Sequence, residues 1–237
     1  MKKLTLDSAE SLASKFRVDI GASLNEPINV KAILRKLNIL TIFKPLSDQL
    51  CGLSLKSATD RRFILCNSRS TKGRQHFTIA HEFYHLFYDE NPIPHICSEE
   101  NGGKNTNEKN ADAFASALLM PKGGLLQFIS EKELTEKELH IATILKLEHY
   151  FSVSRLSLLT RLKALGLLSE KSYTMLKEYP IVESAKQYGY ETSLYFKGQD
   201  FLVIGDYVEK ARRLFEQGTI SEGHFNETIN LITNDEN

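Results

Sequence analysis

The residues with the clearest chemical potential form the run His81-Glu82-Phe83-Tyr84-His85. In an α-helix, side chains four positions apart project from one face, so both imidazoles can bind one ion while the intervening glutamate lies beside it. We therefore predict that His81 and His85 are zinc ligands. Glu82 is predicted to be the catalytic base that takes a proton from water on the metal. The alternative is that these side chains only line a solvated helix face.

A catalytic zinc site needs a third protein ligand and an open fourth position. We predict Glu108 as that ligand, with Asp112 one turn later on the same helix. Both carboxylates border the apolar face of this helix, where an unpartnered carboxylate would lose several kcal/mol of hydration. Asp112 is predicted to accept a hydrogen bond from the free ring nitrogen of His81 or His85 and so fix its tautomer.

Other residues compete for the third position. His95 and Cys97 follow His85 by 10 and 12 residues in a Pro-rich segment and could reach back, and Asp112 is itself a candidate. Glu108 could instead be a capping residue near a helix start, where negative charge is favourable. The remaining histidines are not assigned to the metal: His76, which lies on the wrong side of its helix, His140, His149 and His224.

The composition indicates a cytoplasmic protein with a substantial core. Of 237 residues, 41% are hydrophobic, and 30 basic residues balance 30 acidic ones, so no overall charge favours nucleic acid or an anionic membrane. No stretch approaches the roughly 20 apolar residues of a membrane span, and the start lacks an apolar signal run. The 3 cysteines are odd in number and widely spaced, which favours a reducing compartment and unpaired thiols.

The periodicity predicts an α+β fold in which a small β-sheet packs on the helix over 71–89, followed by a mainly helical C-terminal part. A bound peptide would pair with an exposed strand above the metal, and we expect this edge to be Gly52–Lys56 or Phe63–Asn67. The expected strands are 39–43, 52–56, 63–67, and a hairpin formed by 193–196 and 201–204. The expected helices are 7–16, 27–37, 71–89, 107–121, 133–150, 154–165, 169–177, and a helical hairpin over 206–232.

Three parts are expected along the chain. Residues 1–130 should form the catalytic core, 131–178 a helical lobe that resembles a helix-turn-helix, and 179–237 a β-hairpin with a helical extension. Residues 90–107 contain Pro92, Pro94 and the stretch SEENGGKNTN, so we expect a loop there.

The two stretches RQHFTIAHEFYHLFYD and EKNADAFASALLMP are similar to motifs of the ImmA/IrrE metallopeptidase family, and the resemblance covers roughly residues 28–168. It implies a zincin active-site helix of the thermolysin-like (gluzincin) type, with one zinc ion held by His81, His85 and Glu108 and with Glu82 as the base. It also implies a protein partner as substrate: a helix-turn-helix repressor, cut once in an anti-repressor role in a mobile element or stress response.

We do not expect DNA binding or membrane contact. The segment FSVSRLSLLTRLKALGLLS resembles a helix-turn-helix, but residues 132–171 hold seven basic and five acidic side chains, too little net charge for strong phosphate binding. Arg155, Arg161 and Lys163 would be its phosphate contacts. The main alternative function is a zinc-stabilised regulator that binds a repressor or DNA without proteolysis. A metallohydrolase of small peptides or cell wall is a weaker alternative.

Overall fold

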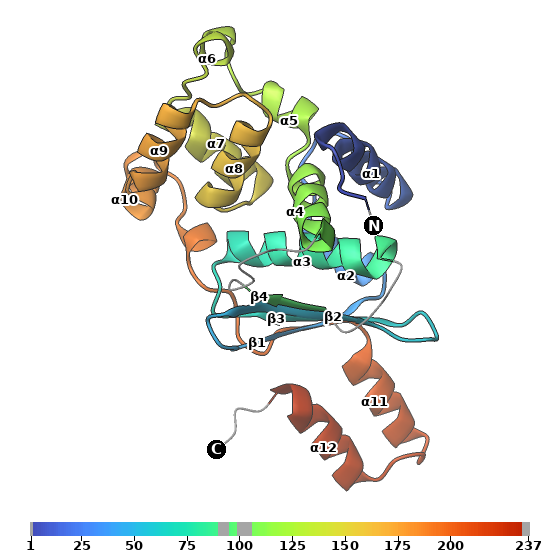
Figure 1. The fold of residues 1–237 in the computed structure, drawn as a ribbon. Helices are drawn as coiled ribbons and strands as arrows, with labels where there is room; N and C mark the ends of the chain where they lie inside the picture. Colours follow the sequence, from blue (N-terminus) through green and yellow to red (C-terminus); the bar gives the residue numbers. More distant parts are fainter. Residues whose placement is uncertain (1, 90–94, 99–105, 234–237) are drawn as a thin grey trace.

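The computed structural model describes residues 2–89, 95–98 and 106–233, and Figure 1 shows its α+β fold. The strands are β1 (Leu40–Lys44), β2 (Leu50–Lys56), β3 (Arg62–Asn67), β4 (His95–Ser98) and β5 (Val203–Ile204). The helices are α1 (Leu6–Asp19), α2 (Val30–Lys36), α3 (Lys72–Tyr88), α4 (Thr106–Leu119), α5 (Lys122–Leu126), α6 (Glu131–Glu136), α7 (Ile141–Phe151), α8 (Arg155–Ala164), α9 (Glu170–Glu178), α10 (Ile181–Gln187), the 3-10 helix η1 (Ser193–Tyr195), α11 (Tyr207–Glu216) and α12 (Glu222–Thr233). Among the described residues, no helix is long and apolar enough to cross a membrane.

The strands form one five-stranded sheet in the order β4-β2-β3-β1-β5. Strands β1 and β3 run parallel, and every other neighbouring pair is antiparallel. The prediction that Gly52–Lys56 or Phe63–Asn67 forms the sheet edge is therefore wrong. Strand β3 pairs on both sides, and β2 pairs with β3 and, through Leu50–Ser54, with β4. Two prolines and a polar stretch flank β4 in the sequence, and such a composition indicates a loop and hides the short strand.

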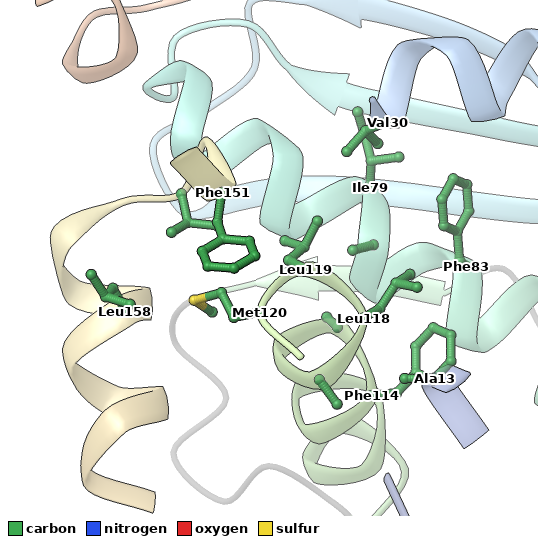
Figure 2. Close-up of a cluster of buried hydrophobic side chains, with 14 of the residues drawn as sticks. Ala13, Val30, Ile79, Phe83, Phe114, Leu118, Leu119, Met120, Phe151 and Leu158 are labelled. Atoms are coloured by element: carbon green, nitrogen blue, oxygen red, sulfur yellow. The ribbon is translucent and has the colours of Figure 1, made fainter. Parts of the chain in front are cut away.

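Helix α3 covers one face of the sheet. Alternate strand residues point toward it, as the period of two in a β-strand requires, and they are buried: Thr41, Phe43, Gly52, Ser54, Ile64 and Cys66. On its other side α3 packs against α4 (Figure 1). Figure 2 shows this second layer, in which Phe83 of α3, Phe114 and Leu118 of α4 and Ala13 of α1 belong to one buried cluster. Helix α3 is therefore buried between two layers.

The expected C-terminal β-hairpin is also wrong. Residues Ser193–Tyr195 form a 3-10 turn, and β5 pairs with β1 instead of with them. The backbone N–H of Phe201 donates to the carbonyl of Phe43, and the N–H of Phe43 donates to the carbonyl of Leu202. Strand β1 has five residues, so its edge offers β5 more backbone hydrogen-bonding groups than the short segment Ser193–Tyr195 would. The expected helix over 133–150 is likewise divided, because Lys137 adopts a left-handed conformation between α6 and α7.

Two arginines of the helix-turn-helix-like segment are buried structural residues. Arg155 is 1% exposed and donates from Nε and Nη2 to the Glu148 carboxylate, which also accepts from the Tyr195 hydroxyl at 2.6 Å. Arg161, equally buried, donates to the Glu10 carboxylate and to the Met120 carbonyl. Neither guanidinium is available to a phosphate backbone, so the DNA-binding alternative loses two of the three phosphate contacts that it would require.

Replacing Arg155 with alanine should lower the free energy of unfolding by about 3–5 kcal/mol, because it leaves the buried Glu148 carboxylate without its cation. Lys163→Ala is the matched control. The Lys163 side chain is 42% exposed, so its replacement should lower the free energy of unfolding by less than about 1 kcal/mol. Urea denaturation followed by circular dichroism measures both. Equal midpoints for the two variants would contradict the structural role of Arg155.

Candidate active site

Helix α3 carries a polar strip into the core of the protein. Its start is fixed by Gln75, whose side-chain amide donates to the carbonyls of Ser68 at 3.0 Å and Ser70 at 2.9 Å and so holds the turn after β3. Further along, His81, Glu82 and His85 are 1%, 0% and 4% exposed. Buried polar groups are stable only when they have partners, so this strip must be satisfied from neighbouring elements.

The first turn of α4 brings Glu108 to the two histidines, as the apolar face of this helix predicted. Its carboxylate oxygens lie 3.4 Å from His81 Nε2 and 3.4 Å from His85 Nε2, and the two Nε2 atoms are 3.2 Å apart. Donors held about 2.1 Å from one tetrahedral ion stand about 3.4 Å from one another. The three donors therefore have the spacing of a zinc or similar divalent cation site, and this is the one such cluster among the described residues.

Each imidazole is oriented from behind by a carboxylate. His81 Nδ1 lies 3.0 Å from Asp112 Oδ1, and His85 Nδ1 lies 3.2 Å from Asp89 Oδ2. A proton on each Nδ1 would be donated to these carboxylates and would leave both Nε2 lone pairs for a cation. Asp112 is thus placed as the sequence predicted. Asp89 was missed, although its spacing of four residues from His85 was the signal that could have identified it.

The carboxylates also favour positive charge at this position. Burial lowers the pKa of the His81 imidazole, but hydrogen bonds to Asp112 and Glu108 and the charge of Glu82 outweigh it and raise the pKa to about 10. A cluster that holds an extra proton so firmly in the absence of metal has the electrostatic character required to hold a cation.

Glu82 lies on the sheet side of α3, beneath Gly52 of β2. A Cβ atom at Gly52 would stand 2.7 Å from Thr78 Cγ2, 3.0 Å from the Leu65 carbonyl oxygen and 3.6 Å from Glu82 Oε1. Only glycine lets the helix approach the strand this closely. Gly52 therefore allows the part of α3 that carries Thr78 and Glu82 to lie close against β2, a function that the sequence did not reveal.

The other candidate ligands lie elsewhere or outside the described side chains. His76 Nδ1 is 2.8 Å from the Ser152 carbonyl oxygen, and burial lowers the pKa of its imidazole. Cys51 and Cys66 are buried, and burial raises the pKa of the Cys66 thiol. The side chains of His95 and Cys97 are not among those described, so the two competing assignments for the third ligand rest on the sequence alone.

Comparison with known proteins gives one finding that covers this site. A model of a peptidase family, described as the IrrE N-terminal-like domain, matches residues 34–163, which is more than half of the 237-residue chain. The matched region contains α3, α4 and the whole cluster of imidazoles and carboxylates. No curated protein matches the chain.

Removing either supporting carboxylate should weaken zinc binding. Asp112→Asn and Asp89→Asn should each raise the zinc dissociation constant about 10- to 100-fold, because the imidazole loses its orienting acceptor. Asp60→Asn, on the exposed turn before β3, is the control with the same chemical change and should have no effect. Competition against a chromophoric chelator gives the constants. Unchanged affinity in both cluster variants would exclude a supporting role.

Zinc affinity should rise with pH. The pKa of His81 is raised from 6.5 to about 10, so the imidazole of the metal-free protein stays protonated well above neutrality and the ion must displace that proton. Between about pH 7 and 9, each pH unit should raise affinity up to about tenfold. Asp112→Asn removes a hydrogen bond that raises the pKa of His81. The zinc affinity of this variant should therefore depend less steeply on pH. Identical slopes would show that Asp112 does not stabilise the imidazolium.

Proposed function

The chain belongs to the peptidase family described by the IrrE N-terminal-like domain, and from this premise we propose that it is a zinc-dependent endopeptidase. The observation that carries the proposal is the convergence of His81, His85 and Glu108 on one position beside the buried Glu82. Three protein ligands leave a fourth coordination position open, as in catalytic rather than structural zinc sites. A structural site would also have no use for Glu82.

In the proposed mechanism each buried group has a separate task. Zinc, when bound, acts as a Lewis acid and lowers the pKa of water toward about 7. Glu82 accepts the proton released as water attacks the peptide carbonyl and passes it to the leaving amine. Asp112 and Asp89 keep the imidazole rings in one tautomer and orientation, so the ligand atoms need no rearrangement during the reaction.

The edge strand β4 provides a place for the substrate backbone. It pairs with β2 on one side and forms one end of the sheet, and no strand among residues 2–89, 95–98 and 106–233 pairs with its other side. An extended peptide can add to such an edge through main-chain hydrogen bonds. Main-chain pairing discriminates little between sequences, so specificity must come from side-chain contacts elsewhere.

The proposed substrate is a helix-turn-helix repressor cut at one site in the cytoplasm. Two observations support this proposal. The stretches around His81 and Glu108 resemble motifs of the ImmA/IrrE metallopeptidases, and the chain belongs to the peptidase family of the IrrE N-terminal-like domain. Cutting such a repressor would switch on the genes that it silences, in a mobile element or a stress response. The buried state of Arg155 and Arg161 agrees with recognition of a protein partner rather than DNA.

Glu82→Gln should lower the rate of repressor cleavage by about 10²- to 10⁴-fold while zinc stays bound, because the amide cannot take up the proton. The substrate to test is the repressor encoded beside this gene, incubated with the zinc-loaded protein and analysed by mass spectrometry. Glu183→Gln, an exposed glutamate of α10, is the control. If the repressor binds but neither wild type nor Glu82→Gln cuts it, the non-proteolytic alternative replaces the peptidase.

A further inference from the structure

Asn107 lies in the first turn of α4, one position before the metal-ligand candidate Glu108. Its side-chain amide donates from Nδ2 to Asp89 Oδ2 at 2.5 Å. Asp89 is the residue at which α3 ends, and it stands 18 positions earlier in the chain. The hydrogen bond therefore ties the end of one ligand-bearing helix to the start of the other.

The carboxylate oxygen that accepts from Asn107 also faces His85. Asp89 Oδ2 lies 3.2 Å from His85 Nδ1, so the same oxygen stands between an imidazole and an amide. An amide N–H can only donate, and an ionised carboxylate can only accept. A proton on His85 Nδ1 then completes two hydrogen bonds that converge on one atom. Two donors from different helices hold the Asp89 side chain more firmly than one donor would.

The two carboxylates that orient the imidazoles differ in how they are held. Asp112 lies inside α4, where the backbone hydrogen bonds of the helix fix its position. Asp89 is the C-cap of α3 and has extended backbone angles, φ −77° and ψ 127°, so it stands just past the last helical residue. A carboxylate at that point needs an anchor outside its own helix, and Asn107 of α4 supplies one.

The amide oxygen of Asn107 argues against the ordinary role of an asparagine at a helix start. Such an asparagine caps the helix, because its side-chain oxygen accepts a hydrogen bond from a backbone N–H. Asn107 Oδ1 is buried and accepts no hydrogen bond within the part of the chain that the structure describes. A buried oxygen without a hydrogen bond is unfavourable. The orientation of this amide therefore serves the hydrogen bond to Asp89 and not a cap.

We infer that Asn107 is a positioning residue of the metal site. It holds the Asp89 carboxylate against His85 Nδ1, so that His85 Nε2 stays aimed at the position of the metal. Asn107 and Glu108 are adjacent, so one turn of α4 supplies both a ligand and the support of a second ligand. The inference rests on the candidate metal site of the proposed function, but not on the cleavage of any substrate.

A double-mutant cycle on zinc affinity tests whether Asn107 acts through Asp89. Asn107→Ala should raise the zinc dissociation constant about tenfold, measured by competition against a chromophoric chelator, because Asp89 loses its anchor. In the Asp89→Ala protein, which lacks the carboxylate itself, the same change should have no further effect. In the Asp112→Asn protein, where the support of the other imidazole is removed, the full effect should remain. Equal losses in all three backgrounds, or no loss in any, would overturn the inference.

Asn110→Ala is the matched control from the same helix. Asn110 is 1% exposed, and its side chain accepts from the Leu4 N–H at 2.7 Å and donates to the Lys2 carbonyl at 3.1 Å. Its replacement should lower the midpoint of urea unfolding and leave zinc affinity unchanged. A loss of zinc affinity as large as that of Asn107→Ala would show that any destabilisation of α4 loosens the site, and the inference would fall.

Nitrogen-15 spectra of the histidine rings report on His85 without any enzymatic activity. In the zinc-loaded protein, the Nδ1 proton of His85 should exchange with water faster in Asn107→Ala than in wild type, because its acceptor is less firmly held. The Nδ1 proton of His81 should keep its rate. Unchanged exchange at His85 overturns the inference. If the effects of Asn107→Ala are found but no peptide or repressor is ever cut, Asn107 keeps its positioning role and the peptidase proposal falls.

Discussion

Packing between α3 and α4 is the constraint on which the candidate site depends. Two ligand atoms come from one helix and the third from the other, so their separations of 3.2–3.4 Å are set by how closely the helices approach. The rings of Tyr84 on α3 and Phe114 on α4 pack across the interface between the two helices, with centroids 5.9 Å apart. Well-packed interiors are stiff, so this aromatic contact holds the spacing of the ligands without help from a bound ion.

The same packing lowers the stability of the fold, because it buries ionisable groups. Glu82 and Glu108 are 0% and 4% exposed, so both carboxylates are removed from water. Their burial is offset by charge of the opposite sign at the imidazoles, which Asp112 and Asp89 support from positions nearer to solvent, with side chains 31% and 13% exposed. Local departures of this kind from an apolar interior are expected at functional sites, where part of the stability of the fold is given up for chemistry.

The C-terminal region takes part in the fold that holds the site. The backbone N–H of Lys72 at the start of α3 donates to the Phe196 carbonyl, and Thr71 forms an isolated bridge with Lys197. Residues beyond them add β5 to the sheet. The start of α3 is therefore fixed by residues more than a hundred positions away. The helices α11 and α12 pack on each other, with the rings of Phe215 and Phe225 stacked at 5.2 Å.

The sequence by itself determined the α+β class, the family resemblance and the side chains that share one helix face. Helical periodicity is a local property, so the spacing of His81, Glu82 and His85 and the apolar surroundings of Glu108 were readable without coordinates. Only the tertiary structure decided the strand order, the edge strand β4, the place of β5 and the burial of Arg155. Strand neighbours and the partners of buried charges are chosen between segments far apart in the chain, where local patterns carry no information about which surfaces meet.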